Sequence, residues 1–163
     1  MIAAILLLVS AAGASHPAPH IQAAAAAYTA AAAALKQGRY NPAIEHFQKA
    51  IAIEPTYLDA YEGLIAAYEL SKKRTEMART ITEFLQIEPD SLPYRLKLAA
   101  YLDAAGDQQR ALAQYSLALE TDPKNAGALA GFAAAAEKAG MADRAAKVKA
   151  LGHRLYPADK RFE

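Results

Sequence analysis

The segment KQGRYNPAIEHFQKAIAIEP, residues 36–55, returns in outline as AAGDQQRALAQYSLALETDP, residues 104–123. Both segments have glycine at the third position, alanine at the eighth, an aromatic residue at the twelfth, alanine at the fifteenth and proline at the twentieth. The alanines and the aromatic residue recur at helical spacing, which predicts an amphipathic helix between the glycine and the proline. A glycine lets the chain turn back after a helix, and a proline forces the residue before it out of helical geometry. Each segment therefore predicts the turn and the second helix of a helix-turn-helix unit.

This unit recurs over most of the chain with a period of 34 residues. The prolines Pro55, Pro89, Pro123 and Pro157 stand one period apart. The same period aligns two further columns, which are Gly38, Lys72, Gly106 and Gly140, and Ala43, Met77, Ala111 and Ala145. A fixed period of this length indicates stacked units, because one helix pair cannot cover its own apolar face. The period places four units within residues 23–159, at 24–57, 58–91, 92–125 and 126–159.

The repeated pattern resembles that of the tetratricopeptide repeat family. Tyr61, Leu64 and Tyr68 match the first half of the family pattern, and the closing half is carried by Gly38, Ala43, Phe47, Ala50 and Pro55 and by Gly106, Ala111, Tyr115, Ala118 and Pro123. The resemblance implies an all-α fold, a right-handed superhelical α-solenoid of four helix-turn-helix units. It also implies that the concave side is the binding surface.

The second unit departs from this pattern. Lys72, Met77 and Phe84 stand where the other units have small residues. Larger side chains at close-packed positions predict that the helices of this unit pack with a wider separation or a shifted angle.

The two ends of the chain lie outside the repeats. Residues 1–14 are mostly apolar and close with Ala12-Gly13-Ala14, which resembles a secretory signal and its cleavage site. The run is too short to span a membrane and predicts export, with the periplasm as the expected location. An uncleaved N-terminal anchor or a cytoplasmic protein remains the alternative. Residues 15–22 are expected to form a flexible lead-in, and residues 160–163 a tail.

The composition and the missing motifs argue against chemistry in this chain. Lys and Arg number 18 against 17 Asp and Glu, so the strong positive field that nucleic-acid binding requires is absent. There is no cysteine, and the common phosphate, nucleophile, zinc and dinucleotide motifs are missing. The four histidines are scattered along the sequence. We expect no catalytic residue, no metal site and no cofactor.

The family pattern assigns a set of side chains to the groove that the first helices of the units would form. These groove candidates are Tyr28, Leu35, Lys36, Asp59, Glu62, Glu69, Leu96, Asp103, Glu137 and Lys138. Five carboxylates against two lysines, with apolar residues between them, predict a protein or peptide partner that is partly basic. A plain solvated helix surface is the alternative interpretation.

The resemblance therefore implies a non-enzymatic scaffold or adaptor for protein–protein interaction. The signal-like start adds the expectation that it acts in the assembly of an envelope complex. A cytosolic or membrane-anchored interaction module is the alternative, and a regulatory subunit of an enzyme is a minor one. Some members of the family grip chaperone C-termini with Lys, Asn and Arg. Here those positions hold Tyr28, Ala32, Gly63, Pro93 and Lys97, so this clamp is nearly absent.

Overall fold

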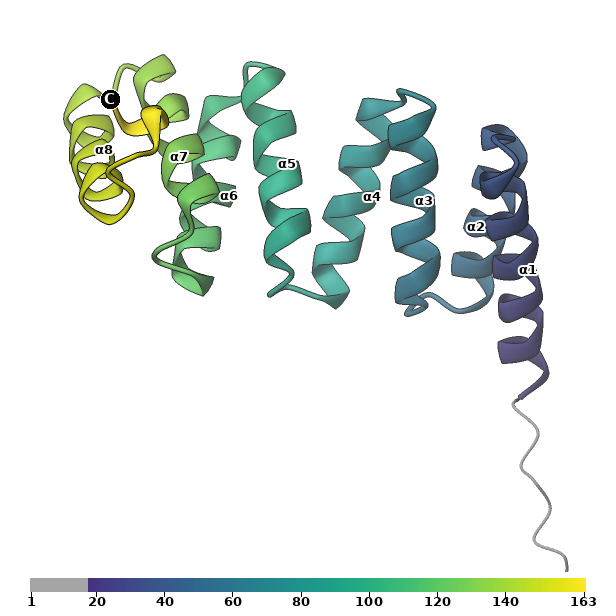
Figure 1. The fold of residues 1–163 in the computed structure, drawn as a ribbon. Coiled ribbons are helices and arrows are strands. Elements are labelled where there is room, and N and C mark those ends of the chain that lie inside the picture. Colours follow the sequence, from purple (N-terminus) through teal and green to yellow (C-terminus); the bar gives the residue numbers. More distant parts are fainter. Residues whose placement is uncertain (1–17) are drawn as a thin grey trace, which may run out of the picture.

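The computed structural model describes residues 18–163 as a row of antiparallel helix pairs (Figure 1). The signal-like segment 1–14 and the first part of the lead-in, residues 15–17, lie outside the described residues. The α-helices of the described part are α1 (Pro19–Lys36), α2 (Tyr40–Ile53), α3 (Leu58–Leu70), α4 (Arg74–Ile87), α5 (Leu92–Ala104), α6 (Gln108–Thr121), α7 (Ala126–Lys138) and α8 (Ala142–Leu155). A short 3-10 helix, η1 (Lys160–Phe162), follows them.

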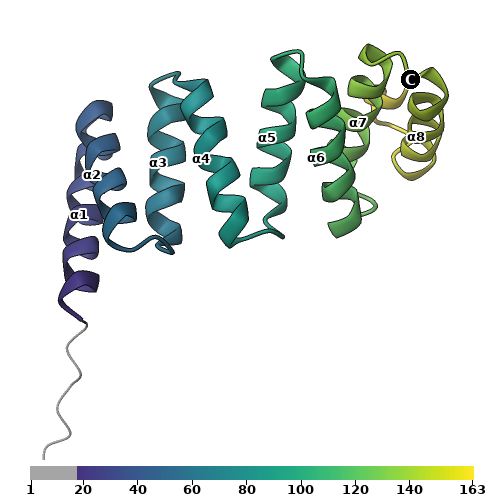
Figure 2. The same cartoon turned by 180° about the vertical axis from the view of Figure 1, so that it is seen from behind.

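The helix pairs follow one another along the molecule in the order of the sequence, with α1 and α2 at one end and α7 and α8 at the other (Figures 1 and 2). The helices α3, α5 and α7 begin at Leu58, Leu92 and Ala126, which keeps the period of 34 residues. No strand occurs in residues 18–163. The prediction of an all-α solenoid is confirmed.

The four turns within the pairs share one backbone conformation. Gly38, Gly106 and Gly140 have φ angles of 71°, 85° and 74°. In each turn the next amide donates to the carbonyl five residues earlier, as Arg39 N does to Ala34 O at 2.9 Å, and this hydrogen bond satisfies a carbonyl that the helix end leaves free. Lys72 adopts the same conformation with a φ of 61°, although it carries a side chain.

Glycines on the first helices accept aromatic rings from the preceding unit. A Cβ added at Gly63 would lie 2.3 Å from the ring of Phe47, and one at Gly131 would lie 2.3 Å from the ring of Tyr115. Phe47 is 1% exposed. Each ring is thus buried against the bare backbone of the next unit, which brings α2 close to α3 and α6 close to α7.

The junction between the second and third units is built differently. Ile81 stands where the first and third units have Phe47 and Tyr115. The bulky ring of Phe84 lies one turn further on, 4.6 Å from the ring of Tyr94. The backbones of α4 and α5 approach each other less closely over their length than those of α2 and α3 or of α6 and α7. The pair α3 and α4 is also the least closely packed of the four pairs. These arrangements agree with the wider packing expected from Lys72, Met77 and Phe84.

Both ends of the repeat array differ from the sequence expectation. Helix α1 begins at Pro19, so residues 19–22 are helical and do not belong to a flexible lead-in. Proline is well suited to the first turn of a helix because its missing N–H has no partner there.

The segment 160–163 is not a free tail. The ring of Phe162 is 4% exposed and packs on Gly152, where an added Cβ would lie 2.2 Å from the ring. Lys149 Nζ donates to the backbone carbonyl of Glu163 at 3.2 Å. The C-terminal segment thus covers the apolar end of α8, as a further repeat would.

Candidate functional site

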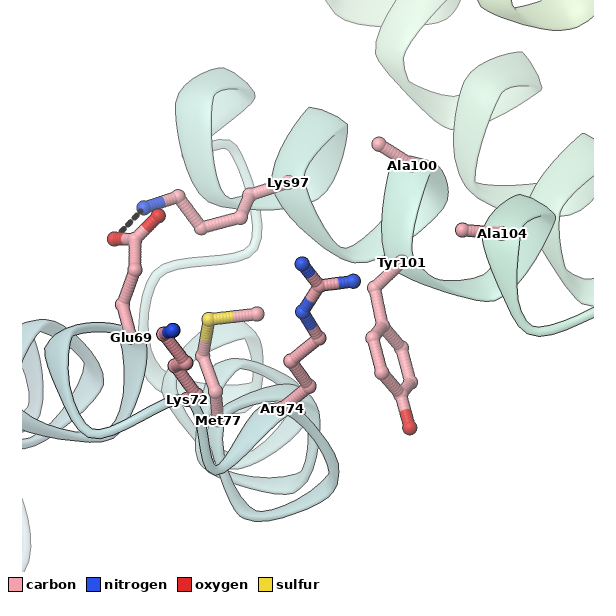
Figure 3. Close-up of a pocket in the computed structure, with 8 residues that line it drawn as sticks. All are labelled: Glu69, Lys72, Arg74, Met77, Lys97, Ala100, Tyr101 and Ala104. Atoms are coloured by element: carbon pink, nitrogen blue, oxygen red, sulfur yellow. Dashed lines mark hydrogen bonds and ion pairs between the residues drawn. The ribbon is translucent and has the colours of Figure 1, made fainter.

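The first helices α1, α3, α5 and α7 form one face of the molecule, which we call the first-helix face. Two pockets open on this face, one on each side of α3. The first pocket, of about 450 Å³, lies between the first and second units and is lined by Tyr28, Ala32, Leu35, Lys36, Phe47, Asp59, Glu62, Gly63 and Ala66. The second pocket, of about 560 Å³, lies between the second and third units and is lined by Glu69, Lys72, Arg74, Met77, Lys97, Ala100, Tyr101 and Ala104 (Figure 3).

In the first pocket, Tyr28 is a half-buried and well-supported aromatic side chain. Its ring centroid lies 5.8 Å from that of Phe47 and 5.3 Å from that of Tyr57. Aromatic contacts at these separations stabilise one orientation of the ring. Tyr28 therefore presents a fixed apolar surface to the pocket.

The carboxylates of the first pocket are exposed. Asp59 and Glu62 form no ion pair among the described residues. The hydroxyl of Tyr94, on the neighbouring α5, forms a hydrogen bond with Glu62. Burial, followed by the charge of Glu62 and this hydrogen bond, raises the pKa of Tyr94 to about 12. The pocket therefore combines an aromatic wall with two carboxylates that have no cationic partner.

In the second pocket, cations outnumber carboxylates. Lys97 Nζ lies 2.6 Å from Glu69 Oε2, so these two charges neutralise each other across the α3–α5 junction. Lys72 and Arg74 are exposed and form no ion pair in the part of the chain that the structure describes. Figure 3 shows Arg74 reaching into the pocket between Met77 and Tyr101.

Further along the face, the remaining groove candidates are also paired. Lys138 Nζ lies 2.7 Å from Asp103 Oδ2, and Lys149 Nζ lies 3.0 Å from Glu137 Oε1. Leu96 is half-buried and packs against the core. These side chains hold neighbouring helices together rather than leaving free charge on the face.

The structure thus brings Tyr28, Leu35, Lys36, Asp59 and Glu62 into one pocket. It changes the charge balance predicted for the groove, because Lys97 and Lys149 neutralise two of the five carboxylates and Lys138 a third. The acidic excess is confined to Asp59 and Glu62.

Several residues of the second pocket escaped the sequence analysis. Lys72 and Met77 were noted as departures from the repeat, but their side chains were assigned to packing. Arg74 and Tyr101 belong to no motif or repeat column that would have marked them as binding residues. They lie near the turn-side end of their helices and outside the family's groove positions.

Within residues 18–163, no group of three or more His, Cys, Asp or Glu side chains converges as a metal site would require. None of the helices in this range is long and apolar enough to cross a membrane.

Comparison with known proteins places the chain among repeat proteins. The family model described as tetratricopeptide repeat matches residues 24–57. The chain is 31% identical over 114 residues to the Hsp70-Hsp90 organizing protein of Triticum aestivum, an alignment that covers 70% of this chain and 20% of the relative. The chain therefore spans about a fifth of that relative's length.

Solved structures with the same fold are numerous. MamA superimposes with a TM-score of 0.68 at 19% identity, covering 81% of this chain and 77% of MamA. YrrB, described as a TPR protein with an unusual peptide-binding site, superimposes with a TM-score of 0.69 at 18% identity, covering 86% of this chain and 72% of YrrB. At these identities the likeness shows the fold.

Proposed function

Because this chain is a tetratricopeptide repeat protein, we propose that it binds a segment of a partner protein on its first-helix face and performs no chemistry of its own. The observation that carries the proposal is the first pocket, where a supported aromatic ring stands beside two exposed carboxylates that form no ion pair among the described residues. Exposed charges that no ion pair neutralises remain available to a ligand, whereas neutralised ones do not. The peptide-binding site named for YrrB supports the same use of this fold.

The chemistry of the first pocket defines the anchor that would fill it. A cationic side chain can pair with Asp59 and Glu62, and its aliphatic stem or a neighbouring apolar residue can pack on Tyr28. Lys36 at the edge of the pocket reduces the negative charge but does not cancel it. We therefore expect the partner segment to carry Lys or Arg next to an apolar residue.

The test uses random peptides displayed on phage and selected on the immobilised chain. Peptides rich in Lys or Arg should be enriched, and their binding should weaken about tenfold or more with the isosteric double variant Asp59→Asn/Glu62→Gln. The variant Glu45→Gln/Glu120→Gln is the matched control, since it removes two exposed carboxylates from the second helices α2 and α6. Peptides that bind the first-pocket variant as well as the wild-type chain would refute the assignment of this site.

We further propose that the protein is exported and acts as an assembly adaptor in the cell envelope. The support is the signal-like composition of residues 1–14 together with the interaction fold. A fusion of residues 1–22 to a reporter enzyme that is active only outside the cytoplasm should give active reporter. A silent fusion would favour the cytosolic alternative, and an intact N-terminus in the mass spectrum of the membrane fraction would favour the anchored one.

A further inference from the structure

The departures from the repeat converge on one place. Lys72 and Met77, which replace a glycine and an alanine of the other units, both line the second pocket. Lys97, which replaces the glycine found at Gly63 and Gly131, lines it as well. Phe84, the remaining departure, lies in the α4–α5 junction against Tyr94 and does not line this pocket. Positions that depart from the repeat pattern are expected to be functional or strained sites.

Lys72 is kept at a conformational cost. Its φ of 61° lies in the left-handed region, where the other three units have glycine. A side chain in this region is disfavoured, and strain of this kind persists mainly at functional sites. The side chain is exposed, so packing does not account for it. What the residue contributes is a cation on the rim of the second pocket.

The charges of the second pocket favour an anion. Three cations line it against the single carboxylate of Glu69, which is already paired with Lys97 at 2.6 Å. Two cations, Lys72 and Arg74, are therefore free. A guanidinium presents a planar fork of donors that matches a carboxylate, and Met77 and Tyr101 give apolar walls for the stem that carries it.

We propose that the second pocket binds an acidic side chain, Asp or Glu, within the partner segment whose basic residue occupies the first pocket. The inference rests on the proposed function and adds a second anchor of opposite charge. An internal side chain is favoured over a chain terminus because the row of first helices continues past the pocket on both sides, to α1 in one direction and to α7 in the other (Figure 1).

The spacing of the two pockets sets the spacing of the two anchors. Asp59 and Glu62 lie in the first half of α3, whereas Lys72 follows the last residue of this helix, so at 1.5 Å per residue the two sets of charges lie about 15 Å apart along it. A sideways step of about 8–10 Å between packed helices brings the separation of the two anchors to about 15–20 Å. An extended peptide advances about 3.3 Å per residue. The acidic residue should therefore stand about five or six residues from the basic one.

The test repeats the phage selection with peptides that are fused to the coat protein through their C-termini and so have no free terminal carboxylate. On the wild-type chain, Asp or Glu should be enriched about five or six residues from Lys or Arg. The double variant Lys72→Gly/Arg74→Gln removes both free cations, and Lys72→Gly also relieves strain, so misfolding is not expected to explain a loss. The control Lys147→Ala/Arg154→Ala removes two exposed cations from α8.

A selected peptide, synthesised with both ends blocked, is then titrated by fluorescence polarisation. Replacing its acidic residue by the amide should weaken binding to the wild-type chain and to the α8 control about tenfold, but to the pocket variant less than twofold. Equal losses in all three proteins, or selected peptides without an acidic preference, would overturn this inference alone. Binding that requires an unblocked C-terminus would also overturn it. Failure to enrich any peptide would overturn the proposed function and this inference with it.

Discussion

Replacing Lys72 by glycine should make the protein more stable. The φ of 61° costs a residue with a Cβ about 1–2 kcal/mol relative to a helical or extended conformation. Glycine avoids this cost but loses more backbone entropy on folding, which takes back about 0.5–1 kcal/mol. Because the Lys72 side chain forms no hydrogen bond or ion pair among the described residues, little else is lost. The net expectation is a gain of about 0.5–1 kcal/mol.

For a domain of this size, such a gain should raise the melting temperature by about 2–3 °C. Urea denaturation followed by far-ultraviolet circular dichroism measures the free energy directly. Gly106→Ala is the reciprocal control, since an added Cβ there meets no atom within 4 Å and only the φ of 85° opposes it. The same two terms act in reverse, so it should cost about 0.5–1 kcal/mol. A Lys72→Gly variant that unfolds at or below the urea midpoint of the wild-type chain would refute the argument that Lys72 is strained.

Three further results are expected. Gly63→Ala should destabilise the protein by about 1–3 kcal/mol, because the new Cβ would lie 2.3 Å from the buried ring of Phe47; an unchanged urea midpoint would contradict this packing. Phe162→Ala should destabilise the C-terminal unit by about 3 kcal/mol and speed hydrogen exchange in α8, whereas unchanged exchange would mean that the C-terminal segment is no cap. Burial, followed by the charge of Glu62, raises the pKa of Tyr94 to about 12 from a usual value of about 10. The contribution of the Tyr94 hydroxyl to the free energy of unfolding should therefore be complete below about pH 10 and be lost as the pH rises towards 12. Urea denaturation of Tyr94→Phe should show a flatter dependence of stability on pH in this range, and a dependence equal to that of the wild-type chain would contradict this assignment.

The fold could be predicted from the sequence because its determinants are local and repeated. The glycine column required a backbone conformation that side chains resist, and the structure has positive φ at Gly38, Gly106 and Gly140. The proline column marked where second helices end, near Glu54, Glu88 and Asp122. The ends of the array were harder to predict, since η1 has no repeat register and the contact of Phe162 with Gly152 joins segments that no period relates.

The candidate site was predicted only in part, for an electrostatic reason. The resemblance to the repeat family placed Tyr28, Asp59 and Glu62 on one face, and they share a pocket. Whether a carboxylate on that face is free or neutralised depends on lysines from other units, as in the pair Lys138–Asp103 at 2.7 Å. Counting charges along the groove therefore overestimated its acidity.

The sequence by itself determined the helices, their turns and the order in which the units stack, because each of these is imposed by the backbone preferences and apolar periodicity of one 34-residue unit. Only the tertiary structure decided which charges stay free. Long side chains such as Lys97 reach across from one unit to the carboxylates of its neighbour, and bulky ones such as Phe84 alter the junction they occupy. Lys72 and Arg74 stay free in the second pocket because Lys97, from the next unit, already neutralises Glu69, and no single repeat specifies this pairing.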